Sequence, residues 1–355
     1  MNARRHIGLL WYVLVLCVFG LLALYSASHQ RGTELVLRQV CWIALGCLVC
    51  LAVAHSDYHR WLDAAYVLYA VALVLMVGLR FVGRTTMGAA RWIDIGGFSL
   101  QPSEVAKLAT VLILARTLGR GDARRTGLSW PQLAGALALA GLPALMVFKE
   151  PDLGSATVIG AIVVGVLWAA GATRRQCLTL AAAVVVAVPL GWHLLHDYQR
   201  ARLVVFINPN ADPLGAGYTI IQSKIAIGSG GWMGKGWLSG TQNQLNFLPE
   251  RHTDFIFSVI GEEWGFLGSL FVVGLLATLV WQGLAIAAQQ QDRVGRLIAT
   301  GIAVGLGYQA AVNVGMVSGI LPVVGVPLPF ISYGGSSMIT AFLGIGLLES
   351  VRRWQ

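Results

Sequence analysis

The stretch Phe247-Leu248-Pro249-Glu250-Arg251-His252-Thr253-Asp254-Phe255-Ile256-Phe257 passes within a few residues from charged to apolar sequence. The apolar run that follows, about 256–287, is long enough to cross the core of a bilayer. A carboxylate such as Asp254 at the mouth of a membrane helix is costly unless it faces a partner or a water-filled cavity. The stretch therefore predicts both a membrane span and chemistry at a membrane surface.

Apolar runs recur along the whole chain and predict an all-α polytopic membrane protein. Hydrophobic residues make up 56% of the 355 residues, charged residues 12%, and the mean hydropathy is +0.70. Soluble domains average about 25% charged residues. We expect about ten transmembrane helices in a single integral membrane domain, residues 1–355. The expected spans, of which the fourth is short and the eighth is overlong and expected to protrude, are about 8–27, 36–54, 61–79, 103–118, 131–148, 154–171, 177–195, 256–287, 295–319 and 336–351.

The distribution of arginine predicts the orientation of these spans. With an even number of spans both chain ends share a side, and arginine is concentrated in the short loops of that side. Cytoplasmic loops carry an excess of basic residues, so we expect both termini to be cytoplasmic. The formal net charge of +9 is thus a topology signal, and no nucleic-acid partner is indicated. The basic residues on this side are Arg4, Arg5, Arg60, Arg116, Arg120, Arg124, Arg125, Arg174, Arg175, Arg293, Arg296, Arg352 and Arg353.

Two long polar segments, about 80–102 and 196–255, lie on the opposite, extracytoplasmic side of the expected topology. The second is rich in glycine, and its residues 219–227 are typical of an amphipathic helix that lies in the membrane interface or re-enters it. Non-helical backbone at membrane depth persists only against protein or a wet cavity. We therefore expect these two segments to build the functional site.

Asp254 and the charged residues before it, Glu250, Arg251 and His252, are the first candidate site. Asp254 could be a general base whose pKa is adjusted by burial and by Arg251. It could equally cap the helix that starts at Phe255, because aspartate is a preferred N-cap residue. The pattern leaves both interpretations open.

A second candidate is the sequence Gln101-Pro102-Ser103-Glu104-Val105-Ala106-Lys107. Glu104 and Lys107 are three residues apart and share a helix face. They could carry chemistry, or they could form an interfacial ion pair with Lys107 reaching outward. Upstream, Arg91 and Trp92 offer a cation and an aromatic ring suited to a phosphate or a sugar, although a plain interfacial tryptophan anchor fits equally well.

Two further turns complete the set of candidates. The outer turn Lys149–Gly154 contains Asp152, a second acid or a metal ligand if it points into the bundle, and otherwise part of an ordinary solvated loop. The stretch Leu328–Ser337, which includes Ser332, ends in Gly-Gly-Ser-Ser ahead of an apolar helix. Its free N–H groups could bind an anion, or the stretch could be a turn with an N-cap.

These motifs resemble the SEDS family (shape, elongation, division, sporulation). The resemblance covers about residue 80 to the end of the chain, and its RodA-type elongation branch fits better than its division branch. The family-wide motifs are Gly88–Ile93, Gln101–Glu104, Pro151–Gly154, Leu248–Phe257, Gly261–Glu263 and Pro329–Ser337. The elongation-type motifs are His196–Arg200, Asp212–Tyr218, Gln222–Gly228 and Ser318–Pro327.

The resemblance implies a peptidoglycan glycosyltransferase that polymerises lipid II, the undecaprenyl-diphosphate-linked disaccharide-peptide, and so maintains rod shape during elongation. Such enzymes lie in the bacterial cytoplasmic membrane with ten spans and an extracytoplasmic site. They work with a class B penicillin-binding protein transpeptidase and the elongation machinery. The two alternative functions are a lipid II flippase and a non-catalytic scaffold for the penicillin-binding protein. A flippase would show repeats and midplane charges, whereas the charges here cluster on the outer side.

The resemblance also implies roles for residues. Asp254 matches the family's essential aspartate and would deprotonate the acceptor sugar hydroxyl. Cations would meet the charge of the undecaprenyl pyrophosphate leaving group. Asp152 would assist Asp254 or join it in binding a divalent cation, magnesium or manganese. Glu104 would hold Lys107 in place. The candidate cations are Lys107, Arg91 and Arg202, and the other residues expected to bind substrate or support catalysis are Trp92, Glu250, Arg251, His252 and Ser332.

Overall fold

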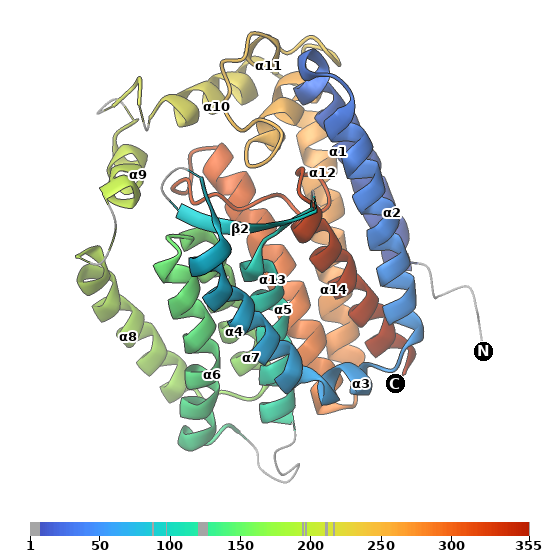
Figure 1. Ribbon diagram of the computed structural model, residues 1–355, viewed down its shortest axis with the longest axis vertical. Helices are drawn as coiled ribbons and strands as arrows, with labels where there is room; N and C mark the ends of the chain where they lie inside the picture. Colours follow the sequence, from blue (N-terminus) through green and yellow to red (C-terminus); the bar gives the residue numbers. More distant parts are fainter. Residues whose placement is uncertain are drawn as a thin grey trace.

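In the part of the chain that the structure describes, ten long helices coincide one for one with the ten apolar runs (Figure 1). The computed structural model describes residues 8–86, 89–96, 98–119, 127–193, 195, 197–209, 212–215 and 217–354. Within these ranges five helices, α1, α2, α6, α12 and α13, are long and apolar enough by themselves to span a membrane. The others are shorter or carry charged side chains. The ten helices are α1 Gly8–Ser28, α2 Glu34–His55, α4 Ala65–Val82, α5 Pro102–Gly119, α6 Trp130–Lys149, α7 Leu153–Ala169, α8 Arg174–Trp192, α12 Ile256–Gln289, α13 Arg293–Val317 and α14 Gly335–Arg353.

Helix α13 is the centre of the bundle and packs against α5, α7, α12 and α14. Small residues let its neighbours approach closely, as is usual in membrane bundles. A Cβ atom added to Gly301 would lie 2.8 Å from the Val111 side chain, and one added to Gly305 would lie 3.1 Å from Ile162. The predicted all-α polytopic membrane fold is therefore confirmed, with the mostly buried α13 at its core.

Contacts at one end of the bundle bring the first and last helices together. The backbone N–H of Leu9 in α1 donates to Glu349 Oε1 of α14 at 3.3 Å, and Arg352 pairs with the same carboxylate. Helix α3, Tyr58–Asp63, lies at this end, where the Tyr58 hydroxyl donates to Asp292 at 2.8 Å. The start of α1 and the end of α14 thus share an end, as an even number of spans requires.

The outer segment 80–102 contains a three-stranded antiparallel sheet in the order β1-β2-β3. The strands are β1 Arg84–Thr86, β2 Ala89–Ile95 and β3 Phe98–Leu100, and the register pairs Ile93 with Leu100. The sequence pattern predicts only a polar loop here, because the strands are short. A serine ties the sheet to α14, because the Ser336 hydroxyl donates to the Ser99 carbonyl at 2.7 Å.

The second outer segment contains α9 Asp197–Ile207, α10 Tyr218–Ser229 and α11 Thr241–Gln244, and a short 3-10 helix, η2 His29–Arg31, follows α1. The predicted amphipathic piece is α10, which buries Ile220, Ser223 and Ala226. The Ser223 hydroxyl donates to the Val317 carbonyl at 2.6 Å and lies 2.8 Å from the Ser258 hydroxyl. Figure 1 shows α10 and α11 at the end of the bundle opposite the C-terminus, while α8 and α9 lie at its margin.

Helix α12 is not one straight overlong helix, because it breaks at Gly265 (φ 63°, ψ −156°). The part before the break does not protrude freely: residues 256–263 are buried under the outer segment. The backbone of that segment bonds directly to α12, with Lys235 N–H donating to the Glu262 carbonyl and Gly236 N–H to the Glu263 carbonyl, each at 3.0 Å. The first part of the long apolar run therefore packs beneath the outer segment and supports it.

Replacing Gly265 by alanine is expected to loosen the outer segment. A Cβ atom there would lie 2.3 Å from the Gly234 nitrogen, and the positive φ disfavours any L side chain. We expect Gly265→Ala to speed proteolytic cleavage within residues 230–245 and to lower thermal stability in detergent. The matched control is Gly274→Ala in the same helix, where a Cβ atom would meet nothing within 4 Å. Equal behaviour of the two variants would contradict the role given to the break.

Candidate functional site

Asp254 lies in a tight turn that ends just before α12. The N–H groups of Thr253 and Phe255 donate to the Glu250 carbonyl at 3.1 and 3.3 Å, and Glu250 has a φ of +48°. Helix α12 begins at Ile256 with Phe255 as its N-cap, and no side chain caps it. The interpretation of Asp254 as an N-cap is therefore wrong, and capping does not engage its carboxylate.

The half-buried carboxylate of Asp254 lies beside the chain that connects α13 and α14. A Cβ atom added to Gly325 in that connection would be 3.3 Å from Asp254 Oδ2. Burial, followed by the negative charge of Glu250, raises the pKa of Asp254 to about 6, although Arg202 and Arg91 pull it down. A carboxyl with this pKa changes its protonation state close to neutral pH, as a general base requires.

Ser332 holds the connection between α13 and α14 against the Asp254 turn. Its hydroxyl donates to the Thr253 carbonyl at 2.7 Å and accepts from Leu328 N–H at 2.8 Å. One residue on, Tyr333 N–H donates to the His252 carbonyl at 3.0 Å, and the His252 and Tyr333 rings are 6.2 Å apart. Ser332 is thus buried and hydrogen-bonded to backbone groups, so it supports the Asp254 turn.

Arg251 and Glu250, which are neighbours in the turn, differ in burial. Arg251 is buried, and its guanidinium donates to the Ala27 carbonyl at 2.7 Å and to the Asn243 carbonyl. Glu250 is exposed, and its carboxylate accepts from the Thr253 hydroxyl at 3.2 Å. Arg251 therefore joins the turn to α1 and α11, while Glu250 contributes negative charge near Asp254.

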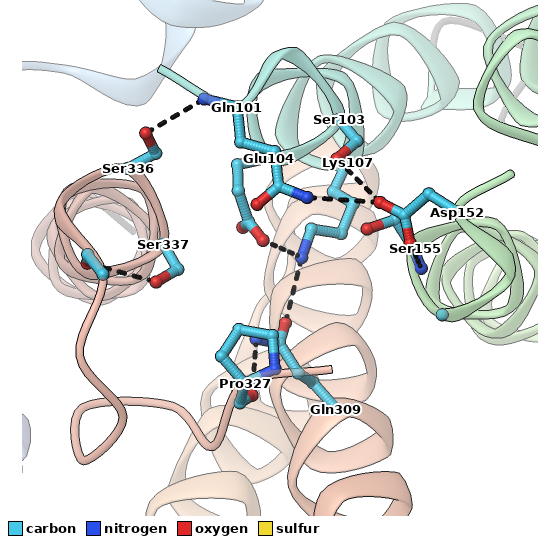
Figure 2. Close-up of polar contacts among 12 residues, drawn as sticks. Gln101, Ser103, Glu104, Lys107, Asp152, Ser155, Gln309, Pro327, Ser336 and Ser337 are labelled. Atoms are coloured by element: carbon cyan, nitrogen blue, oxygen red, sulfur yellow. Dashed lines mark hydrogen bonds and ion pairs between the residues drawn. The ribbon is translucent and has the colours of Figure 1, made fainter. Parts of the chain in front are cut away.

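Glu104 and Lys107 form an ion pair inside the bundle, as Figure 2 shows. Lys107 Nζ donates to Glu104 Oε1 at 2.8 Å and to Gln309 Oε1 of α13 at 3.1 Å, and only 6% of the lysine is exposed. The interpretation of an interfacial pair with Lys107 reaching outward is therefore wrong. The pair borders a cavity of about 60 Å³ whose lining also includes Gln309, Ser337 and Thr340.

Asp152 points into the protein, so the ordinary solvated loop is the wrong interpretation for it. Its carboxylate accepts from Gln101 Nε2 at 3.2 Å, from the Ser103 hydroxyl at 3.3 Å and from Ser155 N–H at 3.1 Å, and it caps α7 (Figure 2). Beside it, burial and the negative charge of Asp152 raise the pKa of Glu150 to about 8. Asp152 thus helps to set the electrostatics of this side of the site.

Arg91 and Arg202 act on the Asp254 carboxylate from two separate elements. Arg91 on β2 is half-buried and donates to the Pro151 carbonyl, and Arg202 on α9 donates to the Val323 carbonyl at 3.4 Å. Trp92 is half-buried and follows Arg91 directly in the strand, so the two side chains point to opposite faces of the sheet. The structure therefore brings both arginines near Asp254 and leaves Lys107 inside the bundle.

Among the described residues, the acids of the site do not gather into a preformed centre of three or more metal-binding side chains. In the described ranges, no group of three or more His, Cys, Asp and Glu side chains could hold a metal ion. Both oxygens of Asp152 already accept hydrogen bonds from the protein. A role of Asp152 and Asp254 in binding a divalent cation together with a substrate phosphate stays a prediction, and the chemistry below uses no metal ion.

Glu262 and Glu263 hold the outer segment rather than face Asp254. Buried Glu262 accepts from Lys235 Nζ at 2.8 Å and from Gln242 N–H at 3.0 Å. Buried Glu263 accepts from the Ser26 hydroxyl and from Asn243 Nδ2, the latter at 3.2 Å. These acids thus tie α1, α11 and α12 together.

A polytopic helix bundle that presents a carboxylate of near-neutral pKa beside two arginines has the features of a membrane-embedded enzyme that acts on a charged substrate. The chain belongs to the FtsW, RodA and SpoVE family of cell cycle proteins, whose model matches residues 7–355.

Three similar proteins define the place of the chain in this family. It is 43% identical over 348 residues to the peptidoglycan glycosyltransferase MrdB of Escherichia coli K12, covering 97% of this chain and 92% of that protein. A chain of a peptidoglycan synthase complex that coordinates polymerization and crosslinking superimposes with a TM-score of 0.80 at 36% identity, covering 98% and 97%. RodA of Thermus thermophilus superimposes with a TM-score of 0.71 at 31% identity, covering 98% and 96%. The predicted RodA type and the predicted class, a peptidoglycan glycosyltransferase, are confirmed.

Removing one member of the Glu104–Lys107 pair is expected to destabilise the bundle. Lys107→Met leaves the Glu104 carboxylate buried without its cation, a loss we expect to cost roughly 3–5 kcal/mol of unfolding free energy. The double variant Glu104→Gln with Lys107→Met removes both charges and should recover most of that loss. Thermal unfolding in detergent measures both. A single variant as stable as the native protein would contradict the buried pair.

Proposed function

We propose that this chain polymerises lipid II into glycan strands, with Asp254 as the general base. The observation that carries the proposal is the Asp254 carboxylate, which has a pKa of about 6, does not cap α12 and lies within the electrostatic reach of Arg202 and Arg91. A base with a pKa just below the working pH is mostly ionised and still takes up a proton readily.

The reaction moves one proton and exchanges one bond at the donor sugar. Asp254 takes the proton from the acceptor hydroxyl, and the freed oxygen attacks the anomeric carbon of the donor. The bond from that carbon to the pyrophosphate breaks, and undecaprenyl pyrophosphate leaves with the electron pair. Positive charge placed in advance near the departing group stabilises such a transition state. Arg91 and Arg202 are suited to this role, because they already act on the Asp254 carboxylate.

Three features support an extracytoplasmic site in the bacterial cytoplasmic membrane. Arginine is concentrated in the loops that share a side with the chain ends. The start of α1 and the end of α14 meet at one end of the bundle. The elements β2, α10 and α11 belong to the opposite end (Figure 1), and Arg251 bonds the Asp254 turn to α11. We accordingly propose that both termini lie in the cytoplasm and that the chain is a single integral membrane domain.

The proposed partners are a class B penicillin-binding protein transpeptidase and the elongation machinery. The support comes from the similarity, over 98% of this chain, to a chain of a peptidoglycan synthase complex that coordinates polymerization and crosslinking. A polymerase that hands its glycan to a crosslinking enzyme gains from being held beside it. The partner would thus receive each strand where it emerges.

Replacing Asp254 by asparagine is expected to abolish polymerisation without unfolding the protein. The carboxylate is disfavoured by its surroundings, so asparagine should leave thermal stability unchanged or raise it slightly. The assay follows glycan formation from purified lipid II by the chain bound to its penicillin-binding partner. That partner carries an inactivated transpeptidase, and no other glycosyltransferase is present.

Each outcome of this assay selects a function. Polymer from the native chain and none from a folded, partner-bound Asp254→Asn variant supports the proposal. Polymer from both removes Asp254 as the base while leaving polymerisation. Absence of polymer from both, in intact complexes, favours the flippase and calls for a transport assay. A scaffold would show partner binding without polymer and without transport.

The pH dependence of the reaction should report the Asp254 carboxyl. A base works only when ionised, so kcat/KM should fall about tenfold per pH unit below pH 6. Glu250→Gln removes a negative charge that raises the Asp254 pKa and should move this acid limb to lower pH. Arg202→Gln removes a positive charge that lowers the pKa and should move the limb to higher pH. Shifts in the same direction would contradict the assignment.

A further inference from the structure

Two buried amide side chains of α13 hold the connection to α14 at the level of Asp254. Gln309 and Asn313 are four residues apart and share one face of the helix. Gln309 Nε2 donates to the Pro327 carbonyl at 3.0 Å, and Asn313 Nδ2 donates to the neighbouring Val326 carbonyl at 2.6 Å. Polar side chains inside a membrane bundle are costly. Two amides that donate to consecutive carbonyls therefore indicate a structural or functional role for both side chains.

Asn313 also holds the backbone of Asp254 itself. Its Nδ2 group donates a second hydrogen bond to the Asp254 carbonyl at 2.9 Å, and none of the residue is exposed. Both atoms that face this amide nitrogen are carbonyl oxygens, so only the N–H₂ end of the side chain can point there. The two hydrogens of one amide group therefore join the Asp254 turn to the connection between the last two helices.

Asn313 holds the part of the α13–α14 connection against which the Asp254 carboxylate lies. Val326 directly follows Gly325, and a Cβ atom at Gly325 would lie 3.3 Å from Asp254 Oδ2. The amide therefore sets the distance between the Asp254 backbone and the segment against which its carboxylate lies. Among the described residues no hydrogen-bond donor reaches the buried Asn313 Oδ1 atom, so this orientation of the amide is energetically costly. Such a cost is more often accepted at functional sites than elsewhere.

We propose that Asn313 is a positioning residue for the reaction, one that acts through the backbone of Asp254. The inference rests on the function proposed above and extends it to a residue inside α13. Catalysis by a general base is sensitive to its placement, and a misplacement of about 1 Å can cost about a hundredfold in rate. Loss of the Asn313 amide should therefore affect turnover more than substrate binding.

The same geometry gives the Glu104–Lys107 pair a part in positioning. Lys107 donates to the Oε1 atom of Gln309 at 3.1 Å, which turns the other end of that amide toward the Pro327 carbonyl (Figure 2). A buried ion pair on α5 thus orients one of the two amides that hold the connection. Lys107 in this account acts on the shape of the site and not on the leaving group.

The test compares Asn313→Leu with Gln290→Leu in the intact complex with the penicillin-binding partner. Leucine keeps the branched shape and the number of heavy atoms of asparagine, is somewhat larger, and removes both hydrogen bonds. Gln290 is a matched control, because it is also buried and donates to one backbone carbonyl, that of Val351 at 2.7 Å, at the other end of the bundle. We expect Asn313→Leu to lower kcat for lipid II polymerisation about tenfold or more, with KM changed little. Gln290→Leu should change kcat less than about twofold.

Two further readouts separate positioning from mere stability. The acid limb of the pH profile should move by about half a pH unit or more in Asn313→Leu, because the carboxylate shifts relative to Glu250 and Arg202. The second readout is the thermal stability of the Asn313→Leu complex beside that of Gln290→Leu, because a positioning role lowers turnover per folded complex beyond any loss of stability. If Asn313→Leu does not fold, Asn313→Ser retains one donor and should give intermediate turnover.

A folded Asn313→Leu complex with native kcat and a native acid limb would overturn the inference. So would a loss of stability with native turnover per folded complex, which would show a purely structural role. Full activity of Asp254→Asn would instead defeat the proposed general base, whatever Asn313 does. Inactive Asp254→Asn with fully active Asn313→Leu would leave the proposed function and remove only the positioning role.

Discussion

Irregular backbone at the depth of a membrane bundle persists only where the protein supplies hydrogen-bond partners, and the connection between α13 and α14 depends on this constraint. Its Val326, Pro327 and Ser332 carbonyls accept from Asn313, Gln309 and Gln39 respectively. Because these donors are side chains of the surrounding helices, the connection has one position in the bundle. The Asp254 turn is hydrogen-bonded to the same connection, so its position in the bundle is fixed as well.

Burial and charge then give Asp254 its chemistry. The turn around Glu250 ends just before α12, which the Asp254 carboxylate does not cap, and burial followed by the negative charge of Glu250 raises the pKa of Asp254. The arginines of β2 and α9 come from segments that are remote in sequence, so the electrostatics of the site depend on the folding of both outer segments. Glu262 and Glu263 contribute to this by fixing one of those segments on α12. Of the acids in these motifs, Asp254 is thus proposed to act in the reaction, whereas Glu262 and Glu263 stabilise the fold.

The sequence predicts the ten helices well because hydropathy over a bilayer's width is a strong signal. It also indicates Asp254, Glu104 and Lys107, since charges in an apolar chain are few. It does not show where Lys107 points, because spacing of three residues fits an outward and an inward pair alike. The strands within residues 84–100 are too short to give a clear sequence pattern. The break at Gly265 lies within a continuous apolar run, so the sequence does not indicate it. Gln309 and Asn313 carried a signal that the sequence analysis missed: two amides one turn apart in an apolar helix.

The central claim is that the fold holds Asp254 as a carboxylate poised near neutral pH. Difference infrared spectroscopy of the detergent-solubilised protein, native against Asp254→Asn, measures this directly through the carboxylic acid C=O band. The account predicts a band that is present in the native protein at low pH, absent from the variant, and lost on ionisation with a midpoint near pH 6. A midpoint near the ordinary aspartate pKa of about 4 would contradict it, because the surroundings would then not poise the group at all.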